Sequence, residues 1–254
     1  MAFVACVGEA SAATIRINSP RINLELAAGE SQSGEIVVEN PTEEAVKVRA
    51  YLEDWIYSTG GTGEKTFSPA GSAPRSCSSW IAFSPANMEI PPFGRSIVRY
   101  TVTVPQTAVG GYNSVLFFET IIGTAKDEEG VNIVVSGRIG SLFFIEVKNT
   151  VERQGVVESL EVKPGSESKP TVLSTRFRNT GNVDVMLAGS FLVMDAEGHV
   201  KGRGQLQPIY TLPGQTEARD SEWVGRLTSG KYQLLVTYDL GKGKNLVEEK
   251  TFSI

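Results

Sequence analysis

The stretch VNIVVSGRIGSLFFIEV, residues 131–147, decides the fold of this chain. Its apolar residues stand at alternate positions, the period of a β-strand, and other apolar residues fill many of the positions between them. One face holds Val131, Ile133 and Val135 and continues through Ile139. A strand that is apolar on both faces is either a central, buried strand or a sheet edge that awaits a partner strand. The sequence leaves both interpretations open.

A short polar turn joins this stretch to another long apolar run at 112–122. Together they predict a hairpin whose strands exceed the usual five or six residues. Upstream, alternation of apolar and polar residues predicts shorter strands within 15–26, 35–40, 46–52, 65–67, 80–81 and 96–104. Gly and Pro mark the turns between them and no helical period is visible. We therefore expect an antiparallel β-sandwich over residues 14–149.

The second half, residues 155–254, shows the same pattern of short alternating strands separated by turns. About seven strands are predicted there, including separate strands at 183–189 and 190–194 and one at 222–227. In each half an early strand runs into a turn led by an asparagine, Asn40 or Asn179. The predicted fold class is all-β, with two immunoglobulin-like antiparallel β-sandwich domains in tandem.

The charge balance argues against one class of function. The 254 residues include 24 Lys and Arg and 29 Asp and Glu, a net charge of −5. Proteins that bind nucleic acid usually carry a basic patch or stripe, so we expect no nucleic-acid partner. No segment approaches the roughly 18 apolar residues of a transmembrane helix.

Residues 1–13 have the features of a truncated signal peptide. Ala10-Ser11-Ala12 is a small-x-small cleavage pattern, and cleavage is expected after Ala12 or Ala13. The apolar run before it lacks a basic beginning, so the recorded start is interpreted as internal to a longer leader. A lipoprotein signal at Phe3–Cys6 is the alternative. Either way the protein is expected in the periplasm or at the cell surface.

The sequence offers little for catalysis, and neither an enzyme nor a cofactor is expected. Cys77 is interpreted as a structural thiol, and His199 as a solvated residue beside a turn, because neither has a suitable neighbour. The run at 60–66 imitates a phosphate-binding loop but has Glu64 where a glycine should precede the lysine. The acidic turn at 127–129 lacks the alternating ligands of a calcium loop, so no metal site is predicted. The tryptophans, Trp55, Trp80 and Trp223, are expected in the core or between sheets.

Four motifs of the first half resemble the periplasmic chaperones of pilus assembly, the PapD-like immunoglobulin-fold chaperones. They are SPRINL at 19–24, GEIVVEN at 34–40, IPPFGRS at 90–96 and IGSLFF at 139–144. The second half resembles this family only as another immunoglobulin-like sandwich.

In that family the chaperone donates a strand to a secreted subunit that lacks one. Two cations hold the subunit's terminal carboxylate in the cleft between the domains. By position, Arg21 matches the first cation. The second falls on Ser141 when the following Leu-Phe pair is aligned, and on Arg138 after a shift of three residues. Arg138 is preferred because a guanidinium group binds a carboxylate bidentately. The edge for strand donation would then comprise Val131, Ile133, Val135 and Ile139.

The resemblance implies a secreted pilus-type subunit, or another β-rich protein, and an outer-membrane usher as partners. A structural or adhesive cell-surface protein that uses its sandwich modules as spacers is the alternative function. Carbohydrate binding is a third hypothesis, for which the sequence shows no aromatic platform.

Overall fold

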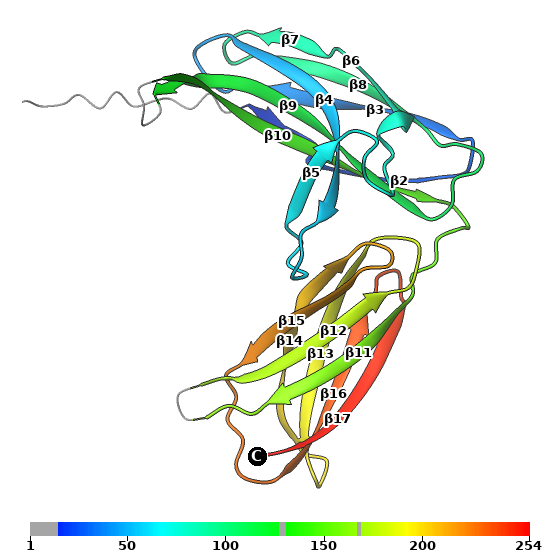
Figure 1. The fold of residues 1–254 in the computed structure, drawn as a ribbon, viewed down its shortest axis with the longest axis vertical. Coiled ribbons are helices and arrows are strands. Elements are labelled where there is room, and N and C mark those ends of the chain that lie inside the picture. Colours follow the sequence, from blue (N-terminus) through cyan, green and yellow to red (C-terminus); the bar gives the residue numbers. More distant parts are fainter. Residues whose placement is uncertain (1–14, 127–130, 167–168) are drawn as a thin grey trace, which may run out of the picture. The chain divides into compact units, whose positions relative to one another are not determined.

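The computed structural model describes residues 15–126, 131–166 and 169–254. The predicted leader, with its alternative lipoprotein signal, and the acidic turn at 127–129 lie outside these residues. The described chain consists of β-strands, turns and one short 3₁₀-helix, η1 (Ser78–Trp80) (Figure 1). The predicted all-β class is confirmed.

The chain divides into two compact units that are not contiguous in sequence. The first comprises the residues up to Asp54, Ser68–Thr107 and Tyr112–Ile145; the second comprises Trp55–Phe67, Ala108–Gly111 and Glu146–Ile254. Two short early segments, 55–67 and 108–111, thus belong to the second unit.

The strands of the first half form two sheets, as in a sandwich. One sheet has the order β1 (Arg16–Ile17), β3 (Ser31–Glu39), β8 (Arg95–Thr103), β6 (Ile81–Ser84). The other has the order β2 (Arg21–Leu26), β10 (Asn132–Val147), β9 (Gly111–Lys126), β4 (Val46–Tyr57), β5 (Lys65–Pro69), and β7 (Asn87–Ile90) also pairs with β4. The predicted long hairpin is β9 with β10.

The core of the first unit lies between these sheets. Ile36 pairs with Val98 in the first sheet, and both are fully buried. Across the interface, Tyr100 of β8 meets Phe143 of β10 edge to face, with ring centroids 5.1 Å apart. Aromatic pairs prefer this geometry and bury a large apolar area, so the contact fixes how the end of β10 packs.

The second unit is also a sandwich. A three-stranded sheet runs β11 (Gly155–Lys163), β12 (Thr171–Asn179), β15 (Thr216–Trp223), and a four-stranded sheet runs β14 (Val200–Thr211), β13 (Val185–Asp195), β16 (Lys231–Asp239), β17 (Asn245–Ser253). Alternate residues of β12, β13 and β16 are buried, which is the pattern expected of strands with one face on a core.

The asparagine-led turns are equivalent in the two halves. Asn40 and Asn179 are both buried. The side-chain amide of Asn40 donates to the carbonyls of Glu44, Ile90 and Pro91, and its oxygen accepts from Thr42. The amide of Asn179 donates in the same way to Val183 and Thr211, and its oxygen accepts from Gly181. A buried polar side chain must satisfy its hydrogen bonds, and here each asparagine does so by closing the turn that follows its strand.

Three predicted strands of the second half were wrong. Residues 183–189 and 190–194 form one strand, β13, rather than two. The strand predicted at 222–227 is displaced, because β15 ends at Trp223. Of the tryptophans, Trp55 is fully buried. Trp80 and Trp223 are half-buried, and Trp223 packs against the core of the second unit.

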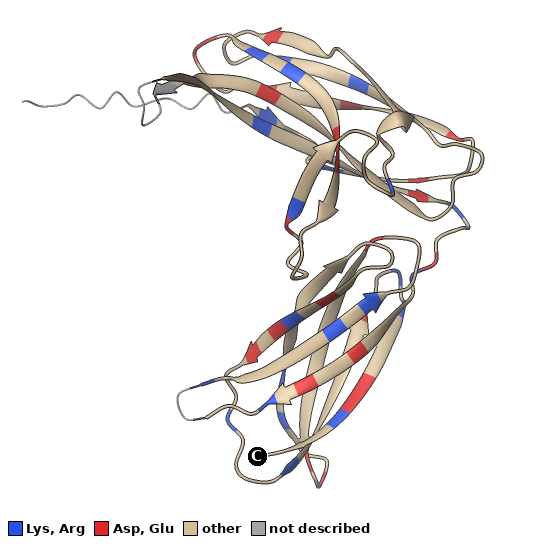
Figure 2. Cartoon of the chain, viewed as in Figure 1, with Lys and Arg blue, Asp and Glu red and all other residues tan. Residues whose placement is uncertain are grey.

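Basic and acidic residues are interspersed along the strands of both units (Figure 2). No helix in the described part of the chain is long and apolar enough to cross a membrane.

Candidate functional site

Strand β10 changes character along its length. Residues 131–136 are all exposed, and we call them the exposed edge. Their apolar members are Val131 at 56%, Ile133 at 44%, Val134 at 64% and Val135 at 39% exposure. Near the end of the strand, Phe143 and Ile145 are almost completely buried.

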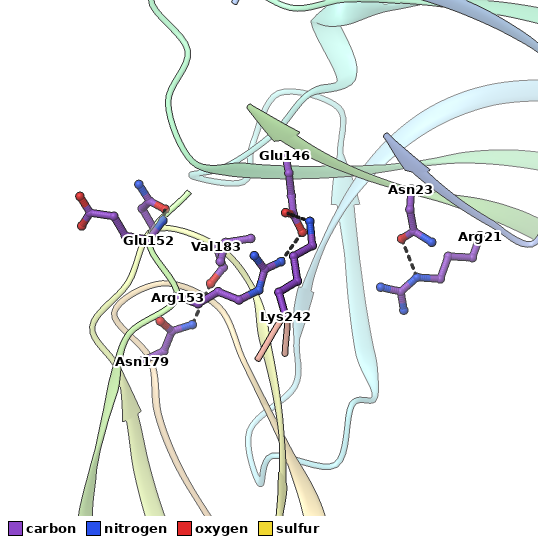
Figure 3. A network of polar contacts seen from close by, with 9 residues as sticks. Arg21, Asn23, Glu146, Glu152, Arg153, Asn179, Val183 and Lys242 are labelled. Atoms are coloured by element: carbon purple, nitrogen blue, oxygen red, sulfur yellow. Dashed lines mark hydrogen bonds and ion pairs between the residues drawn. The ribbon is translucent and has the colours of Figure 1, made fainter. Parts of the chain in front are cut away.

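Two features distinguish the buried half of β10: it packs on the core, where Phe143 meets Tyr100 of the other sheet, and it pairs with the short strand β2. The amide of Leu142 donates to the carbonyl of Pro20, just before β2 begins. The guanidinium group of Arg21, the first residue of β2, lies over the ring of Phe144. The two strands point the same way (Figure 3). We infer that β2, which has only six residues, covers the second half of β10, so that among the described residues the first half has β9 as its only partner.

The two interpretations of this stretch therefore apply to different halves of one strand. The second half is a buried core strand, and the first half is an open sheet edge. Of the predicted donor residues, Val131, Ile133 and Val135 lie on the exposed edge, whereas Ile139 is half-buried beyond it.

An apolar open edge is costly for a protein in water. It presents unpaired backbone groups to any other strand, and natural proteins usually protect such edges with charges or bulges. The exposed edge carries valine and isoleucine instead. Burial of one such side chain stabilises a complex by about 1.5–3 kcal/mol, and a partner strand would add backbone hydrogen bonds. The edge is thus suited to binding an extended segment.

Arg21 is held on two sides. Its Nε donates to Oδ1 of Asn23 at 2.9 Å (Figure 3). Its guanidinium carbon lies 3.8 Å from the centroid of the Phe144 ring. Arg21 and Asn23 are exposed, and Phe144 is buried. Among the described residues Arg21 meets no carboxylate, so its terminal nitrogens keep an unopposed positive charge.

Arg138 has a different environment. Its Nη1 donates to Glu53 Oε1 at 3.0 Å and to the Tyr51 hydroxyl at 3.3 Å. The guanidinium lies 4.1 Å above the centroid of the Phe117 ring. The hydrogen bond to Tyr51 and the charge of Glu53 raise the pKa of Arg138 above its ordinary value. Its charge is therefore opposed by a carboxylate of the same unit.

The two arginines lie too far apart to share one carboxylate as they stand. Phe144 and Arg138 are both even-numbered residues of β10, so they lie on the same face of the sheet. Phe117, which the Arg138 guanidinium covers, lies beside Gly140. Gly140 precedes Phe144 by four residues, which corresponds to about 13 Å along a strand.

Ser141, the other candidate for the second cation position, is fully buried. Its hydroxyl donates to the carbonyl of Ser19 at 2.7 Å, which ties β10 to the segment before β2. The Ser141 side chain therefore has a structural role in joining the two segments, and it carries no charge that could bind a carboxylate.

Asn23 and Glu53 are functional neighbours of the two arginines that the sequence does not predict. Asn23 contacts Arg21 along an exposed strand face, and Glu53 contacts Arg138 from a strand distant in sequence. Neither residue belongs to a recognisable motif. Asn23 could have been suspected, because residues two apart on a strand share a face and Asn23 stands two positions after Arg21. Glu53 could not, because β4 meets Arg138 across the whole width of β9.

Cys77 is structural, as predicted. Its side chain is fully buried at the start of η1. Burial, together with the nearby Asp54 carboxylate, raises the pKa of this thiol well above its ordinary value. Because the thiolate is the reactive form, the folded protein keeps Cys77 inert.

His199 is exposed, as predicted, and its backbone amide donates to Asp195 Oδ1 at 2.8 Å. Possible ligand atoms of Asp195, Glu197 and His199 lie within 4.8 Å of one another. However, Lys201 Nζ lies 2.9 Å from Asp195 Oδ2, and this hydrogen bond lowers the pKa of Asp195 to about 2. A lysine therefore already neutralises the carboxylate at the centre of the group.

The glycine-rich run at 60–66 is a strand-to-strand turn. Gly60, Gly61 and Gly63 have positive φ angles of 97°, 64° and 83°, and strand β5 follows. A phosphate-binding loop would be followed by a helix. The interpretation as a loop is confirmed.

No protein-family model matches the sequence, and no curated protein matches it. Solved structures do match the fold. A chain of the chaperone–tip adhesin complex of CFA/I fimbriae biogenesis superposes with a TM-score of 0.51 at 15% identity, over 94% of this chain and 99% of that chain. This chain therefore shares the fold of that chain. The class 5 fimbriae chaperone CfaA gives 0.45 at 13% identity, covering 93% and 99%, and the chaperone YadV gives 0.43 at 14%, covering 94% and 99%.

Proposed function

We propose that this protein is an exported chaperone for pilus-type subunits, to which it lends the exposed edge of β10 as a strand. The observation that carries the proposal is the row of apolar residues at 131–135 on an open sheet edge. Such an edge supplies backbone hydrogen bonds for affinity and alternate side chains for selectivity. The fold it shares with a chain of a chaperone–tip adhesin complex supports the same role.

Arg21 would anchor the terminal carboxylate of the bound subunit. Its exposed guanidinium has no acidic partner among the described residues and stands beside the strand that carries the edge. Arg138 is the second proposed anchor, although it would first have to release Glu53. Anchoring by Arg21 alone is therefore expected to dominate. An outer-membrane usher would be a further partner, and the periplasm the site of action.

Co-expression with a pilus-type subunit tests the proposal. A stoichiometric complex should be recovered with the wild-type chain, and Ile133→Asp should abolish it. Arg21→Ala should weaken it more than Arg138→Ala does. A complex that survives all of these changes would contradict the proposal.

Fractionation separates the proposal from the alternative of a structural or adhesive spacer. A chaperone should be released with the periplasm on osmotic shock, whereas a spacer should remain with the envelope. Retention in the envelope together with failure to bind any subunit would favour the spacer.

A further inference from the structure

The contacts of Arg21 differ from those of two other arginines in its sheet. Two further arginines of this sheet, Arg49 and Arg138, also lie over aromatic rings, at 5.3 Å and 4.1 Å from the centroids. Arg138 has a carboxylate partner in Glu53. Arg21 has the closest ring, at 3.8 Å, and its hydrogen bond is to a neutral amide oxygen.

We propose that Asn23 and Phe144 are positioning residues that turn Arg21 into a single-arginine carboxylate site. The inference rests on the proposed function, because it assigns the residues that prepare its anchor. The side-chain oxygen of Asn23 accepts a hydrogen bond from the Nε–H of Arg21, and the ring of Phe144 packs against the flat face of the guanidinium. The two terminal nitrogens of Arg21 are then available for a ligand, and they can donate two parallel hydrogen bonds to one carboxylate.

The choice of asparagine at this position is what keeps the site available. An aspartate has the same shape and would accept the same hydrogen bond, but its negative charge would neutralise the guanidinium. The neutral amide fixes the group and leaves its charge for a ligand. Holding a long side chain in place before binding also reduces the entropy lost on binding, which for one such side chain amounts to about two- to tenfold in affinity.

The ligand class follows from this geometry. The site would take the carboxylate that ends an extended chain lying along β10. A site built on one arginine would bind one carboxylate weakly, and the neighbouring strand pairing would supply the remaining affinity.

Nuclear magnetic resonance of the arginine Nε–Hε groups tests the inference on the full chain, with acetate as the probe and chloride to hold the ionic strength constant. In the wild type, the Arg21 signal should exchange slowly with water and shift saturably with acetate. The Arg138 signal should not respond, because the carboxylate of Glu53 is already bound to the Arg138 guanidinium.

Two substitutions separate positioning from mere structural support. Asn23→Ala should remove the slow exchange of Arg21 and weaken acetate binding by about two- to tenfold. Asn23→Asp should keep the slow exchange and abolish the acetate response. Phe144→Leu should weaken the response while the fold, checked by the rest of the spectrum, is retained. Asn87→Asp makes the same charge change on β7, which is separated from β2 by three strands of the sheet, and should have no effect.

Wild-type acetate binding in Asn23→Asp would overturn the inference, as would fast exchange of Arg21 in the wild type. The proposed function fails separately. If Arg21 behaves as described but Arg21→Ala forms the subunit complex normally, the carboxylate site exists and the anchoring role does not. If the complex depends on Arg21 but not on Asn23, the anchor stands without its positioning residue.

Discussion

The guanidinium of Arg138 and the carboxylate of Glu53 are joined by a hydrogen bond of 3.0 Å between Nη1 and Oε1. The two residues come from β10 and β4, with β9 between them. This ion pair crosses the outer face of the strand that separates them and passes over Phe117. It gives Arg138 a carboxylate partner inside its own unit, and among the described residues Arg21 has none.

Arg138→Ala should therefore destabilise the first unit more than Arg21→Ala does. The ion pair and the stacking on Phe117 together are expected to contribute about 1 kcal/mol, because the Arg138 side chain is 38% exposed and solvent screens the pair. Arg21→Ala should change stability by less than about 0.5 kcal/mol. Urea unfolding of both variants measures the difference, and Glu53→Gln should reproduce most of the loss seen for Arg138→Ala. Equal losses for the two arginine variants would show that the ion pair contributes nothing.

Ile133→Asp should prevent subunit binding without unfolding the protein. Ile133 is already exposed in the free chain, so a charge there costs the fold little, with an expected stability change within about 0.5 kcal/mol. In a complex the same charge would be buried without a partner, which is strongly unfavourable. Thermal unfolding and a pull-down with the co-expressed subunit give the two readouts.

Val200→Asp is the matched control for that variant. Val200 lies on β14 of the second unit and is 55% exposed. Its replacement should leave both the unfolding temperature and the complex unchanged. If Val200→Asp disrupts the complex as strongly as Ile133→Asp, the loss reflects charge in general and not the edge of β10.

The sequence was sufficient to predict the long hairpin and the asparagine turns, because both are local patterns. It could not predict that β10 is half buried and half exposed. Ile133 and Ile145 stand in the same alternation, yet Ile133 is exposed and Ile145 is buried, because the second half of β10 packs on the core, where Phe143 meets Tyr100 of the other sheet. Which part of a strand is covered depends on the other strands of the fold and leaves no trace in the residues of the strand itself.

The errors in the second half have equally specific causes. The sequence predicts a break between Gly189 and Ser190, but β13 continues through them. A side chain at Gly189 would approach Leu206 within 2.9 Å, and the pairing with β14 shifts register there. Gly189 therefore allows the side chain of Leu206 to pack close to the backbone at a β-bulge, and it does not form a turn. Strand β15 was misplaced because TEARDSEW is mostly polar and lacks the alternation that marks a strand.

Cys77 should resist alkylation until the protein unfolds. In Cys6→Ser, where Cys77 is the remaining thiol, iodoacetamide at pH 8 should label the denatured chain fully and the native chain only at the rate of unfolding. Rapid labelling of the native chain would contradict the buried position.

The same thiol should make stability fall at high pH. Its pKa is raised in the folded state from an ordinary value near 9.0, mainly by burial. Below pH 9 the thiol is neutral in both states. Above it, only the unfolded chain loses the proton, so stability should fall by about 1.4 kcal/mol per pH unit. Cys77→Ala should remove this slope in urea unfolding between pH 8 and about pH 10, before tyrosines titrate. An unchanged slope would assign the effect to other groups.

Glu146 should contribute to the stability of the second unit in the opposite pH range. Burial raises the pKa of Glu146, but hydrogen bonds from Arg153 and Lys242 outweigh it, and the net pKa is lowered (Figure 3). A lowered folded pKa gives stability that is present above the ordinary value near 4.5 and is lost as the pH falls through the folded pKa. Glu146→Gln should therefore cost about 1–3 kcal/mol at pH 7, and less as the pH falls below 4.5. Urea unfolding at a series of pH values measures this difference, with Glu152→Gln as the control. Glu152 is an exposed neighbour, so its change should have little effect at any pH, and equal pH profiles for the two variants would refute the role of the Arg153 and Lys242 contacts.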